Sequence, residues 1–268
     1  MSEPRLSDVG RQFLNVFAAI FQVYAAYVAG DAVGAIAREN RSLILPAGYA
    51  FSIWGPIFIL CGAYALHQAM PAERENRRFR AIGWWTAAAF LANGAWTYAF
   101  TNRLFILAQA IIVVALVCAL VAYLRFARMT PSAASRIDTA IIGPALGLLA
   151  GWLTAATVVG FPSTLVSQGF DATRRGAEIG GAALLLLGGG IAVAALLLSK
   201  SGLGAAWVAY GAAVLWALLA VIVEQRAASW LSAGAAALCA LLIIAVMAGP
   251  WAVPVRRVHD PVRGRELA

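Results

Sequence analysis

Aromatic and amide side chains inside apolar segments are the groups of this chain best suited to bind a ligand. In one segment, Phe51, Trp54 and Phe58 fall at helical positions i, i+3 and i+7, so a single helix face carries three rings. In the next, Asn93 and Trp96 are i, i+3 neighbours, and an amide in hydrocarbon needs a partner on another helix or on a ligand. An aromatic stripe at this spacing most often reflects helix packing or an interfacial aromatic belt. For Asn93, an interhelical hydrogen bond and a bond to a ligand are equally compatible with the pattern.

The chain offers little for catalysis or metal binding by side chains. Its 12 acidic residues lie in loops, tails or the ends of apolar segments, and no paired carboxylates or His/Cys cluster are apparent. Proton-coupled transport usually needs acidic residues within the membrane, and metal-dependent lipid chemistry usually needs a cluster of metal ligands. The sequence shows neither pattern. We predict no catalytic residue and no metal site. His67 fits an interfacial side chain or, as the alternative, an axial ligand to a tetrapyrrole metal. The three cysteines lie in apolar segments and are predicted to fill the core.

Composition defines the class of protein. Of the 268 residues, 62% are hydrophobic and 12% are charged, whereas a typical soluble domain has about 25% charged residues. The mean hydropathy is +0.81. A soluble fold of this length has too small an interior to hide so much apolar surface. We therefore exclude a soluble enzyme, a disordered chain and a disulfide scaffold. We predict an all-α integral membrane protein with the lipid bilayer as its partner.

Eight apolar segments are long enough to cross a bilayer, which takes about 20 residues each. They lie at 12–30, 48–70, 81–101, 104–124, 137–161, 178–198, 204–223 and 229–248. The first five hold most of the aromatic and polar side chains, and the last three are mainly Ala, Leu and Gly. We predict a five-helix bundle at 1–161, a membrane extension of three helices at 162–250 and a basic cytoplasmic tail at 251–268. No internal repeat supports an inverted-repeat transporter.

The distribution of Lys and Arg predicts the orientation. With eight spans, both termini share one side, and that side carries 14 of the 20 cations whereas the other carries 6. The positive-inside rule places both termini in the cytoplasm and the loop at 31–47 outside. The same distribution accounts for the net charge of +8 without a nucleic-acid partner. The Ala- and Arg-rich, Lys-poor composition favours the inner (cytoplasmic) membrane of a bacterium.

Three motifs, in this order, resemble the TspO/MBR family of tryptophan-rich sensory proteins and the mitochondrial translocator protein (the peripheral benzodiazepine receptor). Residues 46–58, with Gly55-Pro56 near the centre, resemble the motif that opens the second helix of that family. Residues 91–96 and 152–157 resemble its third-helix and fifth-helix motifs. The resemblance covers about residues 12–161. It implies a five-helix bundle, often dimeric, with an apolar pocket for porphyrins, sterols and benzodiazepine-type ligands.

The resemblance also implies where the ligand binds. The pocket should open toward the loop at 31–47. The predicted ligand-binding residues are Tyr49, Phe51, Trp54, Phe58, Asn93, Trp96, Trp152, Ala156 and Thr157. Ser52 and Phe58 stand where the family motif has Trp, and Gly160 stands where it has Asn, so ligand specificity is expected to differ. No cofactor is implied as obligatory, and a porphyrin or related tetrapyrrole is the expected ligand.

We therefore expect a membrane receptor, carrier or sensor for a flat apolar molecule, most simply a tetrapyrrole or a related lipid. One alternative is a subunit or assembly factor of a larger, pigment-binding membrane complex, because Gly- and Ala-rich helices suit close docking. The other is an enzyme that modifies a porphyrin or lipid, since family members have been associated with porphyrin breakdown. A homodimer and a larger complex are both compatible with the sequence.

Overall fold

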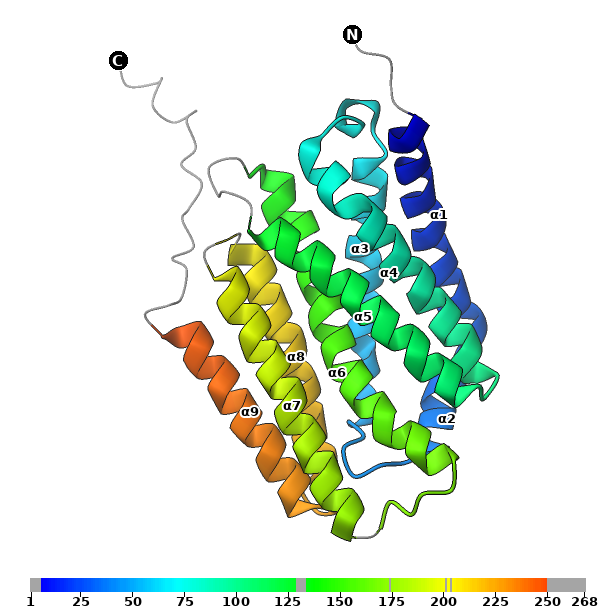
Figure 1. Ribbon diagram of the computed structural model, residues 1–268, viewed down its shortest axis with the longest axis vertical. Coiled ribbons are helices and arrows are strands. Elements are labelled where there is room, and N and C mark those ends of the chain that lie inside the picture. The colour runs from blue at the N-terminus through cyan, green and yellow to red at the C-terminus, as the bar shows by residue number, and fades with distance from the viewer. Residues whose placement is uncertain (1–5, 129–133, 174, 201, 203, 250–268) are drawn as a thin grey trace.

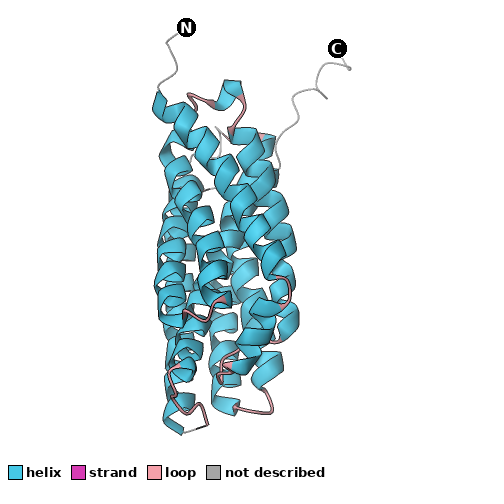
Figure 2. Ribbon diagram, turned by 90° about the vertical axis from the view of Figure 1, so that its right-hand side faces the viewer, coloured by secondary structure: helices cyan, strands magenta, loops and turns pink. Residues whose placement is uncertain are grey.

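The computed structural model describes residues 6–128, 134–173, 175–200, 202 and 204–249, and within these ranges it contains helices and turns but no strand. The long helices alternate in direction along the chain (Figure 1) and run along the long dimension of the molecule (Figure 2). They are α1 (Leu6–Ala29), α3 (Trp54–Gln68), α4 (Arg77–Thr101), α5 (Phe105–Ala127), α6 (Gly143–Ser167), α7 (Arg175–Ser199), α8 (Gly204–Gln225) and α9 (Trp230–Ala248). The short helical segments are α2 (Ala32–Glu39), η1 (Gly48–Ile53), η2 (Pro71–Glu73) and the π-helical turn η4 (Asp138–Ile142).

Among the described residues, seven helices are long and apolar enough to cross a membrane. The eighth long helix, α4, has 25 residues but is less apolar, because Trp, Tyr, Thr and Asn residues fall within it. It nevertheless packs between α1 and α5. The prediction of a multi-span all-α membrane protein is confirmed. When η1 is counted with α3 and η4 with α6, the largest differences in bounds are that α1 begins at residue 6, not 12, and that α6 continues to residue 167, not 161.

Five helices form a closed ring in the order α1, α3, α6, α5 and α4, with α4 packed against α1. Outside this ring, α8 lies along α6, and α9 lies along α7 and α8 (Figure 1). We call the ring the five-helix bundle and α7–α9 the extension. The predicted boundary at residue 161 falls inside α6, and the predicted tail at 251–268 lies outside the described residues. The division into two units stays a prediction.

Glycines allow the extension to dock closely on the bundle. Gly143, Gly147 and Gly151 form one stripe of α6 that faces α8. A Cβ atom added at Gly147 or Gly151 would overlap backbone atoms of α8, so any larger residue would push the two helices apart. The stripe therefore joins the bundle to the extension. The core also holds the three cysteines, which are buried and free, as predicted.

The extension also holds the loop that leads into α3. The backbone N–H of Ala47 donates to the Ala220 carbonyl of α8 at 3.0 Å. Farther along the loop, the Trp216 indole donates to the Ala50 carbonyl at 3.0 Å. Two further contacts, from Gln225 to the Leu45 carbonyl and between Arg41 and Glu224, complete this attachment. Four contacts from one helix thus fix the start of the aromatic segment.

Candidate ligand-binding site

Two pairs of stacked rings form the centre of the site. In α3, Trp54 stacks on Phe58, with ring centroids 5.1 Å apart and planes 20° apart. In α4, Trp96 stacks on Phe100 with nearly the same geometry, 5.1 Å and 21°. Each pair is spaced i, i+4, so the rings lie one above the other on one helix face. Two helices thereby present flat aromatic surfaces.

Three of these rings, Trp54, Phe58 and Trp96, line a cavity of about 420 Å³, which we call the aromatic chamber. Its volume lies within the range of about 300–1,000 Å³ found for small-molecule sites. Helices α1, α3 and α4 form its walls, and α2 contributes Val33, Gly34 and Arg38. Gly30, which also lines the chamber, has a φ of +50°, a conformation that suits glycine, at the turn from α1 into α2. The chamber is therefore shaped by the loop between the first two spans, the loop toward which we expected the pocket to open.

A second, narrower cavity, which we call the apolar crevice, has a volume of about 90 Å³. Phe51, Trp54 and Trp96 line both cavities, and beyond them the crevice extends among α6, α7 and α8. The extension contributes Leu185, Gly188, Gly189, Val214, Ala217, Leu218 and Val221. The hydroxyls of Thr154 and Ser163 in its lining bond to carbonyls of their own helix. The crevice therefore offers a hydrocarbon-like surface.

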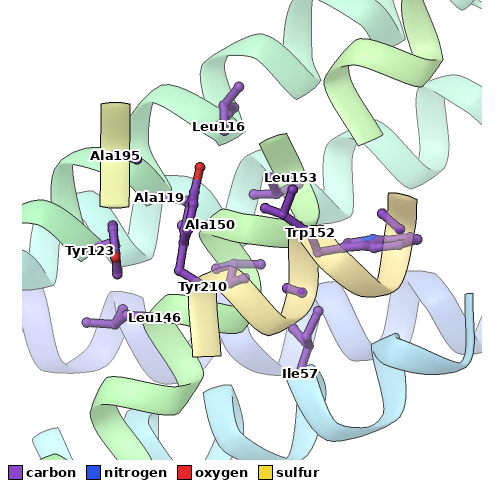
Figure 3. Packing of buried hydrophobic residues seen from close by; sticks show 14 of the residues in the cluster. Ile57, Leu116, Ala119, Tyr123, Leu146, Ala150, Trp152, Leu153, Ala195 and Tyr210 are labelled. Atoms are coloured by element: carbon purple, nitrogen blue, oxygen red, sulfur yellow. The ribbon is translucent and has the colours of Figure 1, made fainter. Parts of the chain in front are cut away.

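Trp152 carries an unusual polar atom at the edge of the crevice. Its ring meets Phe51 and Trp54 edge-on, at centroid distances of 6.0 and 6.1 Å. The residue is 3% exposed and lies in the packed core with Leu153 and Tyr210 (Figure 3). Among the described residues, none bonds to its buried Nε1. An unsatisfied buried donor costs about 1–3 kcal/mol, so an acceptor on a bound molecule would remove that cost.

Asn93 has the interhelical partner that the sequence required, and it also lines the aromatic chamber. Its Nδ2 donates to Oε1 of Gln22 in α1 at 3.1 Å. The buried Nε2 of Gln22 has no partner in the described part of the chain. The helix-packing and ligand-binding interpretations of Asn93 are thus compatible.

The structure distributes the predicted site residues over three environments. Phe51, Trp54, Phe58, Asn93 and Trp96 line the aromatic chamber. Trp152 and Ala156 line the apolar crevice, as does Gly160, one of the departures from the family motif. Tyr49 and Thr157, both described, line neither cavity.

Local contacts explain the two exceptions. Tyr49 lies in the 3-10 turn η1, is 44% exposed and packs edge-on against Trp216 of the extension at 5.4 Å. The Thr157 carbonyl accepts a bond from Gln109 of α5, at 3.1 Å. The Thr157 Oγ1 is buried and has no hydrogen-bond partner among the described residues. Neither Tyr49 nor Thr157 lines either cavity.

Sequence reasoning missed the contributions of α2 and α8. The segment Ala32–Glu39 follows Asp31 and is rich in helix-forming residues, which was a usable signal for α2. On α8, residues 214, 217, 218 and 221 are spaced i, i+3, i+4 and i+7, so they share one face. In a helix that is apolar all round, this spacing does not distinguish a cavity wall from ordinary packing.

The opposite end of the five-helix bundle is closed by buried polar side chains, which we call the polar cluster. Arg11, 1% exposed, donates to Gln68 Oε1 at 2.9 Å and to the Arg74 carbonyl at 2.8 Å. Asp8 is also buried and pairs with Arg80. The first span was predicted to begin at residue 12, so both charges were expected to precede it. They lie inside α1 instead, because their partners from α3, α4 and the loop between them supply the hydrogen bonds that water would supply.

The polar cluster continues one to two turns deeper. Asn15 donates to the Gly83 carbonyl at 2.7 Å, and its Oδ1 accepts a bond from Thr86 at 2.6 Å. The Thr86 hydroxyl is also 2.8 Å from the Tyr64 hydroxyl. At the same end, His67 Nε2 lies 3.7 Å from Glu73 Oε1 and does not line either cavity. This placement matches the interfacial interpretation of His67.

Comparison with known proteins places this geometry in a family. The family model described as TSPO-like protein matches residues 12–248, from α1 to the end of α9. No curated protein and no solved structure matches the chain. The matched region extends beyond residues 12–161, where the motifs lie, and includes the extension. It supports a membrane protein of the sensor or receptor type. The chain belongs to the TSPO-like protein family.

Proposed function

We propose that the protein is a membrane receptor or carrier that binds a tetrapyrrole, or a similarly flat apolar molecule, in the aromatic chamber. The observation that carries this proposal is the pair of ring stacks, Trp54–Phe58 and Trp96–Phe100, beside a cavity of about 420 Å³. Flat aromatic surfaces favour offset or edge contacts with another flat π-system. A planar macrocycle matches these walls better than a bulky aliphatic ring does.

Polar groups at the chamber suit the rim of such a ligand. Arg38 of α2 is exposed and lines the chamber mouth, and its Nη1 would lie 3.5 Å from a Cβ added at Gly34. A guanidinium binds carboxylates through paired N–H groups, and biological porphyrins carry carboxylate substituents. Asn93 of α4 also lines the chamber and offers an amide. The chamber thus supports a ligand with an apolar face and an acidic edge.

Titration of protoporphyrin IX into detergent-purified protein tests this proposal. Tryptophan fluorescence should be quenched saturably, and Trp96→Ala should raise the Kd by about tenfold or more, equivalent to about 1.4 kcal/mol. Trp84→Ala is the matched control, because Trp84 lies on the same helix, is 48% exposed and lines neither cavity. The proposal fails if the wild-type protein shows no saturable quenching or if Trp96→Ala keeps the wild-type Kd.

We propose further that the protein lies in a bacterial cytoplasmic membrane with the polar cluster at the cytoplasmic side and the aromatic chamber at the outer side. The imbalance of 14 cations to 6 supports this orientation. Because Cys61, Cys118 and Cys239 are buried, a newly introduced exposed cysteine reports its own side. On intact cells, an impermeant maleimide should label Asp31→Cys but not Glu75→Cys. The reverse labelling would invert the assignment.

A further inference from the structure

We infer that the ligand carries a flexible hydrocarbon tail in addition to its planar head, and that this tail binds in the apolar crevice between the bundle and the extension. This inference rests on the proposed function, because it takes the head to occupy the aromatic chamber. It adds the chemical class of the ligand, a planar ring system esterified to a long-chain alcohol. It also gives the extension a part in ligand recognition.

The shape of the crevice fits a chain and excludes a second ring system. A volume of about 90 Å³ corresponds to about six to nine water-sized groups. A rigid macrocycle needs a broad slot, whereas methylene groups enter a narrow space one after another. The residues that line this small volume come from all the helices from α2 to α8, so the space is a thin one among many side chains and not a single broad pocket. The crevice therefore matches part of an aliphatic chain.

The two cavities are adjacent at the point where a head and a tail would join. Phe51, Trp54 and Trp96 line both, together with Val33 of α2, so these side chains stand between the chamber and the crevice. The mouth with Arg38 lies on the chamber side, and the α8 residues Val214 and Ala217 lie on the crevice side. A single molecule that passes these rings has its polar edge at the mouth and its tail against the extension.

The chemistry of the crevice points the same way. The hydroxyls of Thr154 and Ser163 already donate hydrogen bonds to backbone carbonyls. Most of the lining therefore has no unsatisfied polar group for a ligand to pair with. The exception is Trp152, whose buried Nε1 has no partner among the described residues and whose ring touches Phe51 and Trp54 at the junction. An ester carbonyl between head and tail is an acceptor at this position. A ligand with a free apolar ring alone would leave the donor unsatisfied.

Two chlorin esters that differ only in the tail test the inference. Methyl pheophorbide a and pheophytin a have the same metal-free macrocycle, and both are uncharged at the esterified group, which is methyl in one and phytyl in the other. Affinities are measured by tryptophan quenching in one detergent at one concentration. Comparing the ratio of the two Kd values between variants cancels the partitioning of the phytyl chain into micelles.

The decisive variant fills the crevice. Ala217→Phe places a ring where the tail would lie. The Kd of pheophytin a should therefore rise about tenfold, while the Kd of the methyl ester should stay within about twofold of the wild-type value. Ala212→Phe makes the same change on the exposed side of α8 and should alter neither Kd. Normal methyl ester binding by Ala217→Phe also shows that the variant is folded. Val214→Phe, one turn away in the same lining, repeats the test if Ala217→Phe does not fold.

Three results overturn the inference. If Ala217→Phe changes neither Kd, the crevice does not hold the tail. If Ala217→Phe weakens both esters equally, the effect belongs to the chamber and the inference is wrong, although the proposed function stands. If neither ester binds the wild-type protein, the proposed function fails and the inference fails with it.

Discussion

The two ends of the five-helix bundle use buried polar groups in opposite ways. In the polar cluster, Arg11, Asn15 and Thr86 reach partners on other helices, and the Arg11 Nε is the atom there without a hydrogen bond, at 3.9 Å from Asp8. In the aromatic half, the buried donors of Trp152 and Gln22 have no partner among the described residues, and cavities lie beside the rings.

This difference separates stability from binding within one bundle. A hydrogen-bonded network in a low-dielectric interior fixes one arrangement of its helices, because breaking any of its bonds leaves a buried polar group without a partner, which costs free energy. An unsatisfied donor beside a cavity has the reverse property, since the protein gains when a ligand supplies the missing acceptor. We therefore expect changes in the polar cluster to lower stability without changing ligand affinity, and changes near the chamber to do the opposite.

The largest effect should come from Arg11→Met. The substitution keeps an apolar stem but leaves Gln68 Oε1 and the Arg74 carbonyl without the donor that Arg11 supplies, and it removes a charge 3.9 Å from Asp8, which keeps its pair with Arg80. Loss of one member of a buried charged set costs about 3–5 kcal/mol, so thermal unfolding followed by circular dichroism should show a clear decrease in Tm. The Kd for protoporphyrin IX below the transition should stay within about twofold. An unchanged Tm would show that the cluster does not hold the helices together.

A smaller loss of stability is expected from Thr86→Val. The shape is kept, but the Tyr64 hydroxyl and Asn15 Oδ1 lose a shared partner, which should cost about 1–3 kcal/mol. Thr101→Val is the control on the same helix, because its hydroxyl bonds to carbonyls of its own helix and lies at the exposed end. Its effect should stay within about 0.5 kcal/mol. Equal destabilisation by both variants would contradict a special role for the network.

Trp152→Phe should affect ligand affinity more than stability, the reverse of the two substitutions in the polar cluster. It removes a donor that has no partner, so the free energy of unfolding should change by no more than about 1 kcal/mol. Affinity for pheophytin a should decrease about five- to tenfold, the equivalent of one hydrogen bond. The control is Trp216→Phe, which removes an indole bonded to the Ala50 carbonyl and should lower stability. If Trp152→Phe destabilises the protein as much as Trp216→Phe does, the comparison between the two ends is wrong.

The smallest effect on binding is expected from Tyr49→Ala. The ring is half exposed and contacts Trp216 edge-on, a contact of about 0.5–1.5 kcal/mol. Stability should decrease by about that amount, and the Kd for protoporphyrin IX should be unchanged, because Tyr49 lines neither cavity. A tenfold increase in Kd would show that Tyr49 does belong to the binding site. The measurement is the same fluorescence titration, with Trp84→Ala as reference.

Local sequence signals were sufficient for the helices and for most of the aromatic face. A run of about 20 apolar residues inside a membrane forms a helix, because only a helix satisfies all of its backbone hydrogen bonds within the segment. Residues 48–53 form a 3-10 turn with three residues per turn, so Phe51 falls in line with Trp54 while Tyr49 points elsewhere. The helix-face argument named Phe51, Trp54 and Phe58 only, and Tyr49 was added because of the resemblance to the family motif.

Local sequence patterns could not predict which distant segments contact each other. That Asn93 needs a partner follows from its place in a span, but its partner Gln22 lies 71 residues earlier. The burial of Arg11 depends on a side chain and a carbonyl 57 and 63 residues away. The crevice exists only because α8 lies against α6. The sequence alone predicts the need for these partners and not their identities.

The hydrogen bonds from α8 to the loop before α3 set an order of events during synthesis. Trp216 bonds a carbonyl that lies 166 residues earlier in the chain. At about 5–20 residues per second, the ribosome takes about 8–33 s to add that length. For this interval the aromatic segment is already made while the helix that holds its loop is not. The binding site is therefore among the last parts of the protein to take its final form.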